Sequence, residues 1–373
     1  MAGPVKKALS IIARYIVVPV GFLIIAVLLL FSVYTGYQRY QAAQAFRIDT
    51  PEGIQSLEQV ALGGVEQWIS IRGHDRNNPV LLFLHGGPGS PVMPVVRHFN
   101  SGLEEFFVVV NWDQRGAGKS YNPDIPMESM TIEQFVSDTL ELTHLLRERF
   151  EQEKIYLMGH SWGTIIGTPA VQQQPELYHA FIGVGQAVSF KEGEKISYNF
   201  TLDEAYRLGD EEAIQQLEDI GPPPYLGDDF HNRIGVQRTW LQKFGGVDYT
   251  QRNPTRADIN YVWLFLTAPE YSLRDTVNML QGGQFSFRAL WEELHQFNYL
   301  EEIPRLEVPV YFLMGRHDYI TVFELVEQYY EVLEAPHKEL IWFENSAHSP
   351  NFEEPERFVE VVTQKILPEN KGG

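Results

Sequence analysis

The 373-residue chain contains no cysteine, and its 29 basic side chains are far outnumbered by 49 acidic ones. The absence of cysteine excludes a disulfide framework, a thiol nucleophile and a cysteine-ligated zinc site. The formal net charge of −20 argues against a nucleic-acid partner, because neutralising phosphates requires clustered lysine and arginine. Hydrophobic residues make up 44% of the chain, which is typical of a globular protein, and the length suits one large α/β domain or two ordinary ones.

The N-terminal segment differs from the rest because no charged residue lies between Arg14 and Arg39. A helix over residues 15–38 would run about 36 Å, enough to cross a bilayer core of about 30 Å. The basic flank, residues 1–14, biases the N-terminus toward the cytoplasm and the body toward the outside. A cleaved signal peptide is the alternative, because Ala43-Gln44-Ala45 resembles a cleavage site. We predict a retained single-pass membrane anchor through residues 15–38, with an extracytoplasmic body.

The body alternates short apolar runs with helical patterns after a polar linker at residues 39–55. Such alternation predicts a mainly parallel sheet with helices on both faces. The alternation breaks over residues 190–300, which predicts a mostly helical insertion between two parts of the core, 56–189 and 301–373. The expected strands are Gln67–Ile71, Val80–Leu84, Phe106–Asn111, Lys154–Met158, Ala180–Val184, Val308–Met314 and Glu339–Phe343, and the expected helices are Thr131–Phe150 (with Thr131 as N-cap), Thr164–Gln174, Val322–Leu333 and Pro355–Ile366.

The strongest chemical motif is Gly159-His160-Ser161-Trp162-Gly163, which follows one expected strand and precedes an expected helix. A G-x-S-x-G motif in this context is typical of a nucleophile elbow, a strained turn that presents the serine at the helix N-terminus. Glycines flank the serine because neighbouring backbone must pass close to the turn. We therefore predict Ser161 as a nucleophile.

A serine nucleophile requires a base to remove its proton and an acid to orient that base. Asp318 follows the strand Val308–Met314, and His348 follows the strand Glu339–Phe343, in the chain order that this architecture uses. The alternatives are a turn-forming role for Asp318, a surface-loop role for His348, and Asp113 as the acid. His317 would point away if Asp318 points inward. We predict Ser161, His348 and Asp318 as a catalytic triad.

A glycine-rich loop, His85-Gly86-Gly87-Pro88-Gly89, follows the strand Val80–Leu84. Acyl transfer builds negative charge on a carbonyl oxygen, and backbone N–H donors must already point at it. A loop at this position supplies one donor, and the residue after the nucleophile supplies another. The predicted oxyanion donors are Gly87 or Gly86 and Trp162.

These motifs, together with Trp112-Asp113-Gln114-Arg115-Gly116-Ala117-Gly118-Lys119-Ser120 between them, resemble the proline iminopeptidase family of α/β-hydrolases. The resemblance covers about 68–186 and 308–352. It implies an α/β-hydrolase fold with a helical lid at 190–300, and a serine exopeptidase that removes an N-terminal residue, often proline. It assigns Ser161, Asp318 and His348 to the triad, and Asp113 and Arg115 to a loop that supports the oxyanion loop.

In that family, lid carboxylates bind the free α-amine of the substrate. A buried ammonium needs such partners to offset its desolvation. The candidates in this lid are Glu204, Glu292 and Glu293, with Asp203 beside them, and none aligns with a family motif. The predicted substrate is a small peptide. An ester or lactone is the alternative within enzymes, and a non-catalytic ligand receptor on the same fold is the alternative outside them.

Neither a metal nor another cofactor is expected. The 11 histidines form no H-E-x-x-H motif. The segment Gly116-Ala117-Gly118-Lys119-Ser120 imitates the end of a phosphate-binding loop, but Asp113 stands where that loop requires its first glycine. The oligomeric state is not predicted.

Overall fold

The computed structural model describes residues 13–227, 229–249 and 254–370. Eight strands of this part of the chain form one sheet in the order β1-β2-β4-β3-β5-β6-β7-β8. The hairpin β1–β2 and the pair β2–β4 are antiparallel, and all other pairs are parallel. The strands are β1 (Ile54–Leu62), β2 (Val65–Gly73), β3 (Val80–Leu84), β4 (Val108–Asp113), β5 (Ile155–His160), β6 (Tyr178–Val184), β7 (Val310–Gly315) and β8 (Lys338–Phe343).

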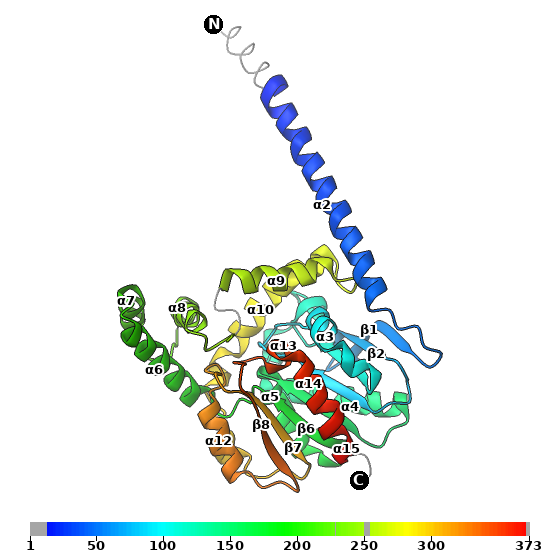
Figure 1. The fold of residues 1–373 in the computed structure, drawn as a ribbon, viewed down its shortest axis with the longest axis vertical. Helices are drawn as coiled ribbons and strands as arrows, with labels where there is room; N and C mark the ends of the chain where they lie inside the picture. Colours follow the sequence, from blue (N-terminus) through cyan, green and yellow to red (C-terminus); the bar gives the residue numbers. More distant parts are fainter. Residues whose placement is uncertain (1–12, 228, 250–253, 371–373) are drawn as a thin grey trace.

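Helices cover the sheet on both faces (Figure 1). Apolar side chains of α4 (Ile132–Phe150), α5 (Trp162–Gln173) and α12 (Phe323–Val332) share one core cluster with the sheet. Those of α3 (Met93–Asn100), α14 (Pro355–Glu360), the π-helical segment Val361–Ile366 and α15 (Leu367–Asn370) share a second cluster. The central strands are buried throughout because both faces are covered. The predicted mainly parallel sheet is confirmed.

The first strand was not predicted. Along β1, half-buried residues alternate with exposed ones until Leu62, which is buried. This is the pattern of an edge strand with one face in water, so its apolar content is too low to stand out in the sequence. Its first residues fall in the segment that was expected to be a linker.

The N-terminal helix α2 (Val18–Ala45) projects away from the body (Figure 1). The helical stretch from Arg14 to Ala45 is long and apolar enough to cross a membrane by length and composition, and its apolar window is fully exposed. The helix continues to Ala45, past the expected end of the span at residue 38, so the connection to β1 is shorter than the predicted linker 39–55. Of the predicted basic flank, residues 1–12 lie outside the described part of the chain.

The insertion after β6 is helical, as the sequence predicts. It has its own apolar cluster, to which Tyr198, Leu217, Trp240 and Trp291 belong. Part of the lid therefore packs as a small unit, whereas Phe265 and Tyr271 of the same insertion belong to the second core cluster. Its helices are α6 (Phe190–Leu208), α7 (Glu211–Ile220), α8 (Phe230–Lys243), α9 (Pro254–Thr267) and α10 (Leu273–Leu294), followed by α11 (Tyr299–Glu302), and a further short helix, α13 (Pro350–Glu353), lies after β8.

Candidate active site

Ser161 occupies the sharp turn between β5 and α5, with φ +55° and ψ −117°. Positive φ is strained for a residue with a side chain, and such strain is concentrated at functional turns. The positions on both sides of this turn require glycine for a steric reason. A Cβ on Gly159 would lie 2.5 Å from the carbonyl oxygen of Gly163, and one on Gly163 would lie 2.1 Å from that of Leu84. The motif therefore has the geometry of a nucleophile elbow.

Asp318 and His348 lie in the loops that follow β7 and β8, and their side chains are in contact. His348 Nδ1 lies 3.0 Å from Asp318 Oδ2. Asp318 is fully buried, whereas the His348 side chain is 12% exposed. Burial alone would raise the pKa of Asp318. The charge of His348 and the hydrogen bonds from His348 and Thr321 together hold that pKa below its usual value.

Thr321 is a third member of this group that sequence reasoning missed. Its hydroxyl donates to Asp318 Oδ2 at 2.7 Å and lies 3.4 Å from His348 Nδ1. Oδ1 of the same carboxylate accepts the backbone N–H groups of Ile320 and Thr321 at 2.8 and 3.0 Å. Asp318 is therefore held as an anion with a fixed orientation.

Ser161 and the ring of His348 lie at the same edge of the sheet. The amide of Ser161 donates to the carbonyl oxygen of Val184 at 2.9 Å. The next residue, Gly185, packs so closely on His348 that a Cβ there would lie 3.2 Å from Nδ1. His160, which precedes the serine, contacts His348 with ring centroids 5.1 Å apart. Burial and, to a smaller extent, the neighbouring charge of His348 lower the pKa of His160 to about 3, so His160 is neutral at physiological pH.

A cavity of about 330 Å³ opens beside the serine. Gly87 of the glycine-rich loop and Trp162 line it together with Ser161, whereas Gly86 packs against Ser161 and His160. Within residues 13–227, 229–249 and 254–370, the amides of Gly87 and Trp162 donate to no protein acceptor. Two unused donors at a serine are the requirement for an oxyanion site. Lid side chains complete the cavity wall, including those of Phe190, Ile234, Arg238, Phe287 and Leu294.

Gln114 connects the glycine-rich loop to the turn of the serine. Its amide N–H donates to His85 Nε2 at 3.2 Å, and its side chain donates to the carbonyl oxygen of His85 at 3.1 Å. Its side-chain oxygen accepts the indole N–H of Trp162 at 2.8 Å. The two parts of the proposed oxyanion site are therefore held in one network.

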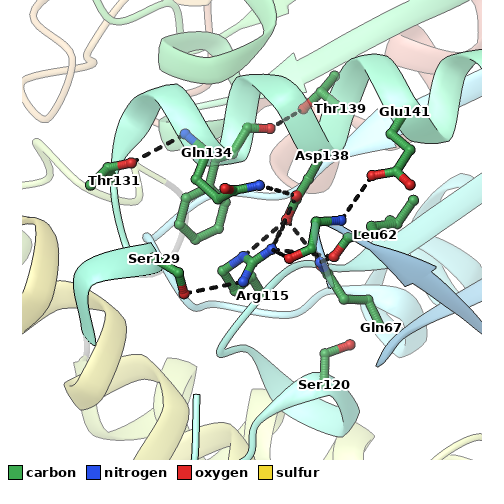
Figure 2. A network of polar contacts seen from close by, with 12 residues as sticks. Leu62, Gln67, Arg115, Ser120, Ser129, Thr131, Gln134, Asp138, Thr139 and Glu141 are labelled. Carbon is green, nitrogen blue, oxygen red and sulfur yellow. Dashed lines mark hydrogen bonds and ion pairs between the residues drawn. The ribbon is translucent and has the colours of Figure 1, made fainter. Parts of the chain in front are cut away.

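Asp113 and Arg115 lie away from His348 and support neighbouring loops. Asp113 is fully buried, accepts the Tyr271 hydroxyl and accepts the Lys119 amide at 2.8 Å. Burial raises its pKa to about 7, against the opposing effects of these donors. Arg115 forms a buried ion pair with Asp138 at 3.0 Å and donates to the carbonyl oxygens of Leu62 and Gly63 (Figure 2).

The loop that carries His348 is held by a carboxylate that sequence analysis did not single out. Glu353 accepts the backbone N–H groups of Ala347 at 3.0 Å, Ser349 at 3.0 Å and Tyr249 at 2.8 Å. Burial raises its pKa to about 7, although these N–H donors act in the opposite direction. Glu353 therefore positions the residues on both sides of His348.

The lid carboxylates weighed as substrate ligands do not line the cavity of Ser161. Glu204 forms an ion pair with Arg207 at 2.6 Å, and Glu292 is exposed. Glu293 accepts the backbone N–H of Ile132 at 3.0 Å, so it joins the lid to α4. Among the described lining residues the charged one is Arg238, which forms an ion pair with the buried carboxylate of Glu194.

Comparisons with known proteins agree with the fold. A family model described as alpha/beta hydrolase fold matches residues 79–355. The chain is 38% identical over 321 residues to a probable aminopeptidase of Bacillus subtilis, YbaC, covering 85% of this chain and 98% of that protein. It is 26% identical over 308 residues to the proline iminopeptidase of Heyndrickxia coagulans, covering 79% and 93% of the two chains. The crystal structure of a membrane phospholipase A superposes with a TM-score of 0.59 at 18% identity, covering 99% of this chain and 100% of that one, so the match extends into α2.

Proposed function

Because the chain belongs to the α/β-hydrolase fold family, we propose that it is a membrane-anchored serine hydrolase that cleaves an acyl bond. The observation that carries the proposal is the contact of 3.0 Å between His348 Nδ1 and Asp318 Oδ2 at the sheet edge that also carries Ser161. In this arrangement the aspartate selects the histidine tautomer whose other nitrogen is free to accept a proton.

The proposed reaction has two stages. Ser161 Oγ attacks the acyl carbon while His348 takes its proton, and the N–H groups of Gly87 and Trp162 bind the resulting oxyanion. Each such donor contributes about 3–4 kcal/mol to transition-state stabilisation. His348 then protonates the leaving group, and the same histidine activates a water molecule that hydrolyses the acyl-enzyme.

The proposed substrate class is a short peptide with a free N-terminus, as for an aminopeptidase of the proline iminopeptidase type. The names of two relatives, a probable aminopeptidase and a proline iminopeptidase, support it. Among the lid residues whose side chains the structure describes, Glu194 is a buried carboxylate behind the cavity wall, with a side chain 2% exposed. A substrate ammonium that bound it would have to displace the guanidinium of Arg238.

The charge of the cavity favours a second candidate, a carboxylic ester or lactone hydrolase. Arg238 is the charged residue among the described lining residues, and the rest of the wall is mainly apolar. A neutral acyl chain fits such a wall without the desolvation cost of an ammonium group. The same triad serves both reactions, so the substrate preference depends on the lid.

We also propose that α2 anchors the protein in a membrane and that the catalytic domain lies outside the cytoplasm. An uncharged stretch that spans a bilayer by length supports the anchor. The few basic residues before the span support the orientation. The side of the membrane is tested by protease protection of the full chain in sealed vesicles.

The test of function uses the full chain in detergent and Ser161→Ala as its control. Prolyl and other aminoacyl arylamides are compared with p-nitrophenyl esters, and a fluorophosphonate probe reports the nucleophile. We expect amide turnover and probe labelling that both disappear in Ser161→Ala without a change in melting temperature. Ester turnover without amide turnover would defeat the peptidase proposal. Absence of both turnover and labelling in the folded protein would favour a non-catalytic receptor.

A further inference from the structure

The base of α2 packs against the lid at a segment that we call the lid elbow, residues 261–280, which joins the end of α9 to the first turns of α10 (Figure 1). The rings of Tyr34 and Trp263 lie 5.7 Å apart, and Thr35 beside them is buried. Arg39 Nε donates to the carbonyl oxygen of Leu266 at 2.9 Å. Because Arg39 ends the uncharged stretch of α2, the C-terminal end of α9 lies at the level where the anchor leaves the apolar part of a bilayer.

The inner side of the lid elbow is fixed to the body by polar contacts. Its two acidic residues are both neutralised by ion pairs, and a buried tyrosine hydroxyl adds a third contact. The elbow therefore keeps its orientation relative to the core and offers no unpaired negative charge to an anionic surface. The contacts are Glu270 with Arg97 at 2.7 Å, Asp275 with Lys119 at 3.1 Å, and Tyr271 with Asp113 at 2.6 Å.

The outer side of the elbow carries three exposed apolar residues. Leu273, Val277 and Leu280 are 55%, 53% and 58% exposed, and their spacing places them on one face of α10. Scattered exposed apolar residues are common, but a continuous stripe marks an interaction surface. Arg274 adjoins the stripe, is exposed, and forms no ion pair with any described residue.

We propose that the lid elbow lies in the headgroup region of the same bilayer that holds α2. Leu273, Val277 and Leu280 contact the upper acyl chains, and Arg274 binds lipid phosphates, as in helices that lie in a membrane interface. The proposal rests on the membrane anchor of the proposed function, and the contacts of Trp263 and Leu266 in the same elbow with the base of that anchor select lipid as the occupant. Phe287 of the cavity wall follows Leu280 by seven residues, about 10 Å of helix. The lid contact therefore places the cavity close to the membrane surface.

The chain contains no cysteine, so single labelling sites can be introduced into the full protein. An environment-sensitive fluorophore is attached to Val277→Cys, to Val332→Cys as a control of equal exposure on α12, and to Leu29→Cys in the anchor. Each variant is placed in nanodiscs of phosphatidylcholine and phosphatidylglycerol that hold one chain each, which excludes a second copy as the occupant. Quenching is compared between a nitroxide on the lipid headgroup and a soluble nickel chelate.

We expect the label at position 277 to be quenched severalfold more by the lipid nitroxide than the label at position 332, and less by nickel. Leu280→Cys should repeat this result. If position 29 lies in lipid while positions 277 and 280 behave like position 332, the elbow proposal is overturned and the anchor stands. If position 29 is accessible to nickel, the anchor fails and the elbow proposal fails with it. Neither outcome affects the test of serine hydrolysis.

Discussion

The ring Nε2 of His160 lies 3.1 Å from the backbone carbonyl oxygen of His348. Because burial keeps His160 neutral, with a pKa of about 3, one of its ring nitrogens carries the proton. Nδ1 has no partner among the described residues, so the proton belongs on Nε2, which donates to His348. The residue before the proposed nucleophile thus holds the backbone of the proposed base.

This hydrogen bond predicts a difference in kcat between two substitutions of His160. His160→Phe keeps a ring against His348 but removes the donor, whereas His160→Gln places an amide N–H near the same point. We expect kcat to fall about tenfold or more in His160→Phe, because small displacements of a catalytic group are costly, and to recover partly in His160→Gln. Equal activity of the two variants, at equal melting temperature, would show that the hydrogen bond does not position His348.

The hydrogen bond from Thr321 to Asp318 predicts a difference in kcat between two substitutions of Thr321. Thr321→Val preserves the shape of the side chain but removes the hydroxyl that donates to Asp318 Oδ2 at 2.7 Å. A hydrogen bond to a charged group contributes about 1.5–3 kcal/mol, which corresponds to a fall in kcat of about tenfold to a hundredfold if the effect is fully expressed in the transition state. Thr321→Ser retains the hydroxyl and is expected to retain most of kcat. Steady-state kinetics of both variants provides the test, and a KM effect alone would contradict this role.

The sequence alone suggests the three proposed catalytic positions because each follows a parallel strand, and parallel strands end at one edge of the sheet. Asp318 and His348 each follow a continuous apolar run, so their approach follows from the order of β7 and β8 in the sheet. Strand β1 was missed because its alternating pattern is that of an exposed edge. The expected insertion was found because the strand–helix alternation stops at Phe190.

The supporting residues could not be predicted, since their roles depend on packing. Thr321 reaches Asp318 only because the loop after β7 folds back on itself, and Glu353 binds the His348 loop from the four-residue helix α13. Packing can also give a residue a different role from the one that the sequence suggests, as the lid acids show. Glu293 was a candidate for the substrate, but the packing of α10 directs it to the backbone of Ile132.

The buried network around Arg115 predicts a large effect on stability (Figure 2). Asp138→Ala would leave the fully buried guanidinium of Arg115 without its carboxylate, and breaking such a pair costs about 3–5 kcal/mol. The matched control is Glu58→Ala, which removes the partner of Arg149 from a pair that is about one third exposed and should cost less than about 1 kcal/mol. Denaturant unfolding measures both changes. Equal losses would show that Arg115 finds another partner or water.

The raised pKa of Glu353 predicts how the free energy of unfolding depends on pH. Its pKa is about 7 in the folded protein, against 4.5 for a free glutamate, because burial penalises the charged form. Between these values the folded state holds a proton that the unfolded state has released. The stabilisation from Glu353 is therefore complete below about pH 4.5 and is lost as the pH rises through about 7.

The substitution Glu353→Gln removes this titration, so the destabilisation that it causes should shrink as the pH rises from 5 to 8. At about 1.4 kcal/mol per pKa unit, the change across this range is about 3 kcal/mol at most. Melting temperatures of the two proteins at several pH values provide the measurement, and Glu356→Gln on the exposed side of α14 controls for the change in net charge. If the difference in melting temperature between wild type and Glu353→Gln stayed constant with pH, the prediction would be contradicted. Glu353 would then remain ionised throughout this range, because its three N–H donors stabilise the carboxylate.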